Sequence, residues 1–224
     1  IRRQRQMCIR DRYGLLGENG AGKTTLMHLI CGLLFPKNGK CSIDGRNTVE
    51  RQPGALNRYF FLPEEMQMPT ESIVSFAAHH SVFYPHFNQE EFELNLEELK
   101  IDRKQKLSSV SYGQQKKAML AYAFALHTPY ILLDEPTSFL DLPNRYELCT
   151  LLRRLAHDHR KCILFSTHEL DIALSLCDSI ALIDPPVLRY LPTPDMACSG
   201  YIERLFSNSF VTFDTESGTI KVRK

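Results

Sequence analysis

The sequence lacks an apolar run near the ~20 residues that a helix needs to cross a bilayer. Its longest apolar run, Ala118–Leu126, has nine residues and predicts a buried helix. The chain has little net charge, +1 at pH 7, so no overall field directs it to nucleic acid or to an anionic membrane. Its first residues also lack the pattern of a secretory signal.

The seven cysteines include no CxxC pair. Scattered cysteines in odd number predict reduced thiols in the cytoplasm, and they argue against a disulfide framework or a zinc site. Internal repeats and low-complexity linkers are absent as well. With 224 residues, the chain is long enough for one sizeable core, or for a core with a small subdomain.

Residues 1–12, IRRQRQMCIRDR, contain five arginines and follow no strand or helix period. One interpretation is a basic arm that contacts phosphates. We favour a non-native or disordered segment, because MCIRDR resembles translated sequencing adapter joined to a truncated reading frame. Globular sequence is expected to begin near Tyr13.

Short apolar segments alternate with helical patterns from Tyr13 onward. The predicted strands lie at residues 13–17, 58–63, 130–134, 162–166 and 179–184. Between the strands at 130–134 and 162–166, one helix face carries Leu148, Leu151, Leu152 and Leu155. Continuous apolar strands that alternate with helices predict a mostly parallel sheet covered on both faces. The short CSIDG segment, with its Asp-Gly turn, predicts a small antiparallel addition.

The middle of the chain, about residues 66–127, is predicted to be a helical subdomain inserted into the sheet domain. Asn88 can cap a helix in which Phe92, Leu96 and Leu99 share a face. The predicted division is therefore an α/β domain at residues 13–184 and a C-terminal extension at residues 185–224. The extension contains a possible hairpin, VTFDTESGTIKV.

The strongest motif is GENGAGKT at residues 17–24, which fits G-x-x-x-x-G-K-[ST] between a strand and a helix. Its glycines let the backbone curl so that successive N–H groups point at phosphate oxygens, and the following helix adds its positive dipole end. Lys23 is expected to reach the β- and γ-phosphates, and Thr24 to offer a hydroxyl to Mg²⁺. The alternative, a plain glycine-rich turn, is hard to reconcile with all the fixed positions.

Two further predicted strands end in side chains that can take part in catalysis. YILLDE delivers Asp134, which can hold Mg²⁺, and Glu135, which can polarise an attacking water. CILFSTHE ends at His168, which can hydrogen-bond a γ-phosphate. In isolation these are more often solvated acids and a surface histidine, but the carboxyl edge of a parallel sheet is where ligands bind in such folds.

These motifs, in this order, resemble the ATP-binding-cassette (ABC) ATPases, the nucleotide-binding subunits of ABC transporters, over about residues 14–184. The resemblance implies a P-loop NTPase (RecA-like) fold with ATP and Mg²⁺ as cofactors, and catalytic roles for Lys23, Glu135 and His168. It implies that nucleotide contacts come from Gly17, Glu18, Asn19, Gly20, Ala21, Gly22, Lys23, Thr24 and Thr25.

VSYGQ resembles the family's LSGGQ signature, so Ser111, Gly113 and Gln114 are expected to face the nucleotide of a second subunit. EPTSFLD resembles the following segment and makes Asp141 its D-loop aspartate. The resemblance implies a head-to-tail homo- or heterodimer that acts on integral membrane subunits, without nucleic acid. It also implies a cytoplasmic, peripheral location on the inner face of the cell membrane.

Three departures from the family pattern stand out. Tyr112 replaces the first signature glycine; because Ser111 and backbone N–H groups do the binding, a working signature with a capping serine is expected. Glu64 replaces the glutamine that ligands Mg²⁺ with Thr24 and Asp134, so slower or differently regulated hydrolysis is expected. Only 16 residues precede Gly17, so the strand with the adenine-stacking aromatic is expected to be missing, which would weaken ATP binding by about tenfold or more.

The main functional prediction is an ATP-hydrolysing subunit that powers export through separately encoded membrane subunits. A soluble ABC ATPase acting on ribosomes or DNA is the alternative, but such proteins carry two cassettes or long coiled coils. A regulatory subunit without turnover is disfavoured by Lys23, Asp134, Glu135 and His168 together. A GTPase is disfavoured because no NKxD-type tetrad is present.

Overall fold

The main sheet has six strands in the order β4-β5-β6-β1-β7-β8. The computed structural model describes residues 11–158, 161–207, 211–214 and 219–222. The first five strands in that order are parallel, and β8 joins β7 antiparallel at one edge. The strands are β1 (Arg12–Leu16), β4 (Tyr59–Leu62), β5 (Tyr130–Leu133), β6 (Cys162–Thr167), β7 (Ser179–Asp184) and β8 (Val187–Pro192). The predicted mostly parallel sheet is confirmed.

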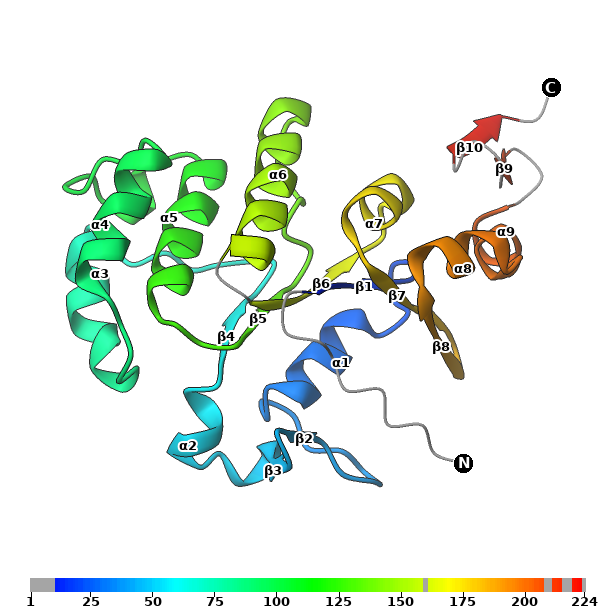
Figure 1. The fold of residues 1–224 in the computed structure, drawn as a ribbon, viewed down its shortest axis with the longest axis horizontal. Helices are drawn as coiled ribbons and strands as arrows, with labels where there is room; N and C mark the ends of the chain where they lie inside the picture. Colours follow the sequence, from blue (N-terminus) through cyan, green and yellow to red (C-terminus); the bar gives the residue numbers. More distant parts are fainter. Residues whose placement is uncertain (1–10, 159–160, 208–210, 215–218, 223–224) are drawn as a thin grey trace.

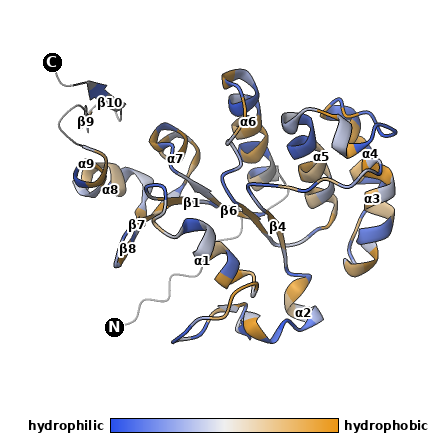
Figure 2. Ribbon diagram, turned by 180° about the vertical axis from the view of Figure 1, so that it is seen from behind, coloured by the Kyte–Doolittle hydropathy of each residue, from blue (hydrophilic) through white to orange (hydrophobic). Residues whose placement is uncertain are grey.

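Helices cover both faces of this sheet, as the alternating pattern predicts. Helix α1 (Lys23–Ile30) lies on one face, and α6 (Leu142–Asp158) and α7 (Leu170–Leu176) lie on the other (Figure 1). The central strands are mostly hydrophobic along their length (Figure 2), and Ile131, Ile163 and Phe165 are fully buried. Strands buried on both faces read as continuous apolar runs, which is why the sequence located them.

A group of helices extends beyond β4 and comprises α3 (Ile73–His80), α4 (Gln89–Glu98) and α5 (Tyr112–Ala125). Each begins with a side-chain cap from Ser72, Asn88 or Ser111 respectively. These helices pack around Tyr122, whose ring contacts the rings of Phe60, Phe76, Phe87 and Phe92. The aromatic cluster joins the helices to strand β4 of the sheet.

Small elements complete the described chain. Asp44 and Gly45 turn the hairpin of β2 (Ser42–Ile43) and β3 (Arg46–Asn47), as the CSIDG segment predicts. The others are three 3-10 turns at Thr48–Glu50, Ser81–Phe83 and Leu107–Ser109, α2 (Pro53–Leu56), α8 (Thr193–Cys198), α9 (Tyr201–Phe206), β9 (Val211–Asp214) and β10 (Thr219–Val222). Strands β9 and β10 form the expected antiparallel pair.

The main sheet extends slightly beyond residues 13–184, although the predicted division into an α/β domain and a C-terminal extension stays a prediction. Strand β1 begins at Arg12, whose guanidinium binds Asp178 at 2.8 Å, one residue before the expected start. At the other end β8 belongs to the main sheet, because it hydrogen-bonds to β7 along its whole length, so the sheet continues past Asp184. The expected non-native or disordered segment lies mostly outside the described residues. Within the described residues, every helix is too short or too polar to span a membrane.

Candidate active site

Four loops meet at the carboxyl edge of the parallel strands. The phosphate-loop sequence follows β1, Glu64 follows β4, Asp134 and Glu135 follow β5, and His168 follows β6. The strand register aligns these exits, since Leu16 pairs with Thr167 and Leu62 pairs with Leu133. A parallel sheet therefore brings residues from distant parts of the sequence to one edge.

The loop after β1 curls back under the first turn of α1. Gly22 has a φ of 97°, in the left-handed region, and N-caps that helix. Lys23 is 6% exposed, and its Nζ donates to the carbonyl oxygens of Gly17 at 2.9 Å and Glu18 at 3.2 Å. The helix thus begins with unpaired backbone N–H groups and its positive dipole end toward the loop, an arrangement that attracts phosphate.

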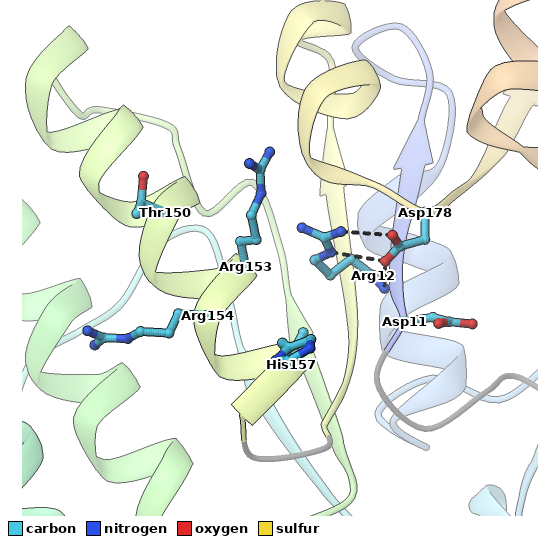
Figure 3. A pocket seen from close by; sticks show the side chains of 8 residues that line it. Asp11, Arg12, Thr150, Arg153, Arg154, His157 and Asp178 are labelled. Carbon is cyan, nitrogen blue, oxygen red and sulfur yellow. Dashed lines mark hydrogen bonds and ion pairs between the residues drawn. The ribbon is translucent and has the colours of Figure 1, made fainter.

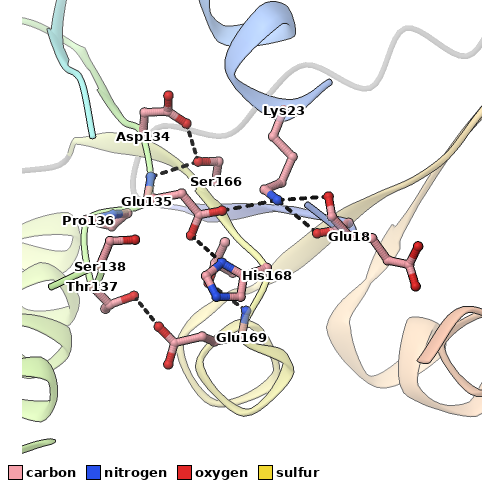
Figure 4. A network of polar contacts seen from close by, with 12 residues as sticks. Glu18, Lys23, Asp134, Glu135, Pro136, Thr137, Ser138, Ser166, His168 and Glu169 are labelled. Atoms are coloured by element: carbon pink, nitrogen blue, oxygen red, sulfur yellow. Dashed lines mark hydrogen bonds and ion pairs between the residues drawn. The ribbon is translucent and has the colours of Figure 1, made fainter. Parts of the chain in front are cut away.

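Glu135 forms the centre of a polar network (Figure 4). Its Oε1 lies 3.1 Å from Nζ of Lys23, and its Oε2 lies 3.0 Å from Nδ1 of His168. The carboxylate is buried, and the lysine that it pairs with is buried too. The three residues predicted to be catalytic are therefore brought together in one chain, with the glutamate between the two nitrogen groups.

Asp134 precedes Glu135 at the end of β5, and its carboxylate is held by a residue of the neighbouring strand β6. Its Oδ1 accepts a hydrogen bond from Oγ of Ser166 at 2.5 Å. The same Ser166 oxygen accepts the Glu135 N–H at 2.8 Å, so one hydroxyl on β6 fixes both acidic residues. In the sequence, Ser166 is recognisable only as part of a predicted strand. Its position opposite the acids depends on the β5–β6 register, which the sequence alone does not reveal.

A cavity of about 410 Å³ opens between these loops. Its lining residues are Asn19, Gly20, Gly22, Lys23, Thr24, Thr25, Glu64, Glu135 and His168. Predicted metal ligands Thr24 and Glu64 lie in this lining, whereas Asp134, 2% exposed, lies behind it. Hydroxyl and carboxylate oxygens are hard donors that suit Mg²⁺, which also takes water and substrate phosphate as ligands. The donor set therefore fits a magnesium site that a bound nucleotide would complete.

The signature residues occupy a separate place. Oγ of Ser111 accepts the N–H of Gln114 at 3.3 Å, which confirms the capping serine. A Cβ on Gly113 would lie 3.4 Å from Leu140, so this glycine lies close to the loop after β5. Oδ1 of Asp141 accepts the N–H of Asn144 at 3.1 Å at the start of α6. Within the described residues, Ser111, Gly113, Gln114 and Asp141 do not line the cavity.

Sequence reasoning passed over Lys116, one turn into α5. Its side chain is 1% exposed, and burial lowers its pKa to about 8, a shift that the nearby Glu64, Glu135 and Asp134 oppose. Lysine is almost never fully buried unless it is paired. In the pattern SYGQQKK it looks like one of several solvated polar residues that precede an apolar run, so only the tertiary packing reveals it.

A larger hollow, of about 650 Å³, lies away from this edge between β1 and α6 (Figure 3). Its arginines already have partners within the chain. Arg12 binds Asp178, and Arg153 donates to the carbonyl of Ser175 at 2.8 Å. Arg154, also in its lining, pairs with Glu98. We assign chemistry to the smaller cavity, because it alone of the two gathers a phosphate loop, carboxylates and a histidine.

Comparison with known proteins agrees with this geometry. A family model described as "ABC transporter" matches residues 8–138. An uncharacterized ABC transporter ATP-binding protein of Methanocaldococcus jannaschii is 29% identical over 194 residues, which are 82% of this chain and 65% of that protein. A methionine import ATP-binding protein of Protochlamydia amoebophila is 29% identical over 189 residues, 79% of this chain and 54% of that protein. The chain thus spans less than two thirds of these relatives.

Among solved structures, one described as an ATP binding subunit of an ABC transporter superposes with a TM-score of 0.74 and 25% identity. The match covers 86% of this chain and 82% of that one. The fold is therefore that of a P-loop NTPase, as the family resemblance implies.

Proposed function

The chain belongs to the ABC transporter family, as an ATP-binding subunit, and from that premise we propose that it hydrolyses ATP to power transport through separately encoded membrane subunits. The observation that carries the proposal is the contact of Glu135 with both Lys23 and His168 beside a phosphate loop. A base, a phosphate-binding cation and a γ-phosphate contact are the parts that this hydrolysis needs.

Nucleotide binding is proposed to replace one of these contacts. The ammonium of Lys23, now paired with Glu135, turns to the β- and γ-phosphates, while the N–H groups at the start of α1 bind phosphate oxygens. Glu135, released from Lys23 but still near His168, then accepts the proton of the attacking water. The buried setting strengthens each of these electrostatic contacts relative to bulk water.

Thr24, Glu64 and Asp134 are proposed to hold Mg²⁺, two of them from the cavity lining and one from just behind it. Bound there, the metal would neutralise charge on the β- and γ-phosphates. Ser166 keeps the Asp134 carboxylate oriented by its hydrogen bond. A carboxylate at position 64, where the family resemblance expects an amide, adds negative charge near the triphosphate, and slower hydrolysis is the expected consequence.

The signature residues are proposed to serve the site of a second cassette. Ser111, Gly113, Gln114 and Asp141 stay off the cavity of their own chain, yet Ser111 caps a helix whose N-terminal N–H groups can bind phosphate. Pairing two chains head to tail would bring each signature to the other's phosphate loop. We extend the proposal to a peripheral location on the cytoplasmic face of the membrane.

The direction of transport stays a prediction. Tyr112 in the signature and Glu64 after β4 favour export, whereas several relatives are named for import. Reconstitution with the membrane protein encoded by a neighbouring reading frame, followed by measurement of ATP-dependent flux in both directions, decides between them. A neighbouring six-helix membrane protein would also favour transport over an action on ribosomes or DNA.

Glu135→Gln tests the proposed chemistry. The amide keeps the shape of the side chain but cannot accept the water's proton or pair as strongly with Lys23, so the variant should bind ATP more tightly, hydrolyse it far more slowly and collect as a nucleotide-bound dimer. ATP titration measures the affinity, phosphate release measures the hydrolysis, and light scattering measures the dimer. Glu147→Gln, on the exposed face of α6, is the control. A Glu135→Gln protein that turns over at the wild-type rate would refute the mechanism.

A further inference from the structure

The side chain of Lys116 reaches from α5 into the loop that follows Glu135. Its Nζ donates to three main-chain carbonyl oxygens, of Glu135 at 3.1 Å, Pro136 at 2.7 Å and Ser138 at 3.1 Å. An ammonium has three donors and no acceptor, so these contacts satisfy it completely. Because a buried lysine spends all three donors on one loop, we infer that it fixes the position of that loop.

Two residues of this loop, Glu135 and Phe139, have an unusual backbone. Their φ values are 43° and 62°, in the left-handed region, which is uncommon for residues with a Cβ. A left-handed backbone at such residues persists where the surroundings over-determine it, and it is often found at functional sites. The N–H of Glu135 donates to Ser166, and its carbonyl accepts from Lys116 and from the N–H of Ser138 at 3.1 Å. Hydrogen bonds therefore hold both the N–H and the carbonyl of Glu135 in place.

The ring of Tyr112 packs against the ammonium of Lys116. The ammonium lies 4.9 Å from the centre of the Tyr112 ring, a cation–π distance. The ring also packs edge-on against Phe139 of the same loop, at 5.5 Å between centroids, and its hydroxyl donates to the carbonyl of Glu64. The residue that departs from the signature pattern therefore contacts both loops that carry candidate catalytic or metal-binding acids.

We propose that Lys116 is a positioning residue for Glu135 that acts through the main-chain carbonyl, and that Tyr112 shields this contact from water. The inference rests on the proposed ATPase function, because it concerns the same carboxylate. Within the described residues Lys116 does not line the nucleotide cavity. It therefore affects how the Glu135 carboxylate is oriented toward the attacking water, and not the affinity for the nucleotide.

Lys116→Met tests this role, because methionine keeps the length of the stem without the donors. Turnover should fall about 10- to 100-fold, as it does when other residues that orient a reacting group from behind are removed. The dissociation constant for ATP should stay within about threefold, a change below 1 kcal/mol. Lys116→Arg should restore much of the turnover, because the guanidinium can still donate to several carbonyls.

Lys161→Met is the matched control for stability. Lys161 is also buried and also donates to a main-chain carbonyl, that of Thr128 at 2.9 Å, but at the opposite edge of the sheet. The Lys161→Met variant should lose thermal stability and keep its turnover per folded molecule. If Lys116→Met does not fold, Lys116→Gln takes its place with the same expectations. A second pair of variants tests whether Tyr112 shields this contact from water. Tyr112→Gly should lower turnover more than Tyr112→Phe, which keeps the ring.

The outcomes separate this inference from the function on which it rests. A wild-type protein that does not hydrolyse ATP would count against the proposed function. Wild-type hydrolysis that Lys116→Met leaves intact, or that Lys161→Met reduces equally, would overturn the role of Lys116 and leave the function standing. Loss of ATP affinity in parallel with turnover would also overturn it, because the lysine would then serve the binding site as a whole.

Discussion

Replacing Ser166 by alanine removes one hydroxyl that serves two buried partners. The hydroxyl is 0% exposed, donates to Asp134 and accepts from the N–H of Glu135. Removing it leaves a buried acceptor and a buried donor unsatisfied, each at a cost of about 1–3 kcal/mol. A loss of about 3 kcal/mol for the pair corresponds to a fall in Tm of about 6–12 °C for a domain of this size.

Thermal and urea unfolding of the nucleotide-free protein measure this loss. Ser175→Ala is the control, since Ser175 is an exposed helix residue whose hydroxyl makes one long bond, 3.3 Å, to the carbonyl of Ile172. The control should change stability by less than about 0.5 kcal/mol. If Ser166→Ala costs no more than the control, the hydroxyl does not hold the two acids in place.

Two further predictions concern stability away from the cavity. Gly32→Ala should lower the Tm by several degrees, because Gly32 has a φ of 64° and an added Cβ would lie 2.3 Å from the carbonyl oxygen of Thr48; an unchanged Tm would show that the turn can shift. Burial lowers the pKa of Lys161 to about 8 from its ordinary 10.5, partly opposed by Glu91. The unfolded chain then binds more protons between pH 8 and 10.5, so the wild type should gain stability relative to Lys161→Met as pH rises through that window. A difference between the two proteins that stays constant in urea titrations across the window would contradict this burial.

Much of the fold follows from patterns that need no tertiary information. The segment YILLD predicts a strand buried on both faces, because its apolar run is continuous and too short for a typical helix. The phosphate loop is recognisable because its glycines and its lysine stand at fixed spacings. Asn88 and Ser111 cap their helices as expected, since a cap depends only on a residue and the turn that follows it.

What escaped prediction depends on neighbours that are distant in sequence. Ser166 matters because the β5–β6 register puts it opposite Asp134, and register is a property of the assembled sheet. Lys116 matters because α5 packs against the loop after Glu135. Strand β8 has the sequence VLRYLP, with no run of buried apolar residues, and only its pairing with β7 places it at the edge of the main sheet.

The ring of Tyr122 has a consequence for how the molecule unfolds. It contacts Phe60 in the sheet and also Phe76 and Phe92 in α3 and α4, and the buried residues around it form one continuous cluster from the helices into the strands. The helices beyond β4 therefore share their hydrophobic core with the sheet instead of enclosing one of their own. We expect the two parts to melt in a single cooperative transition, so that removing the helices would leave Phe60 and its strand exposed and the remaining sheet unable to stay folded.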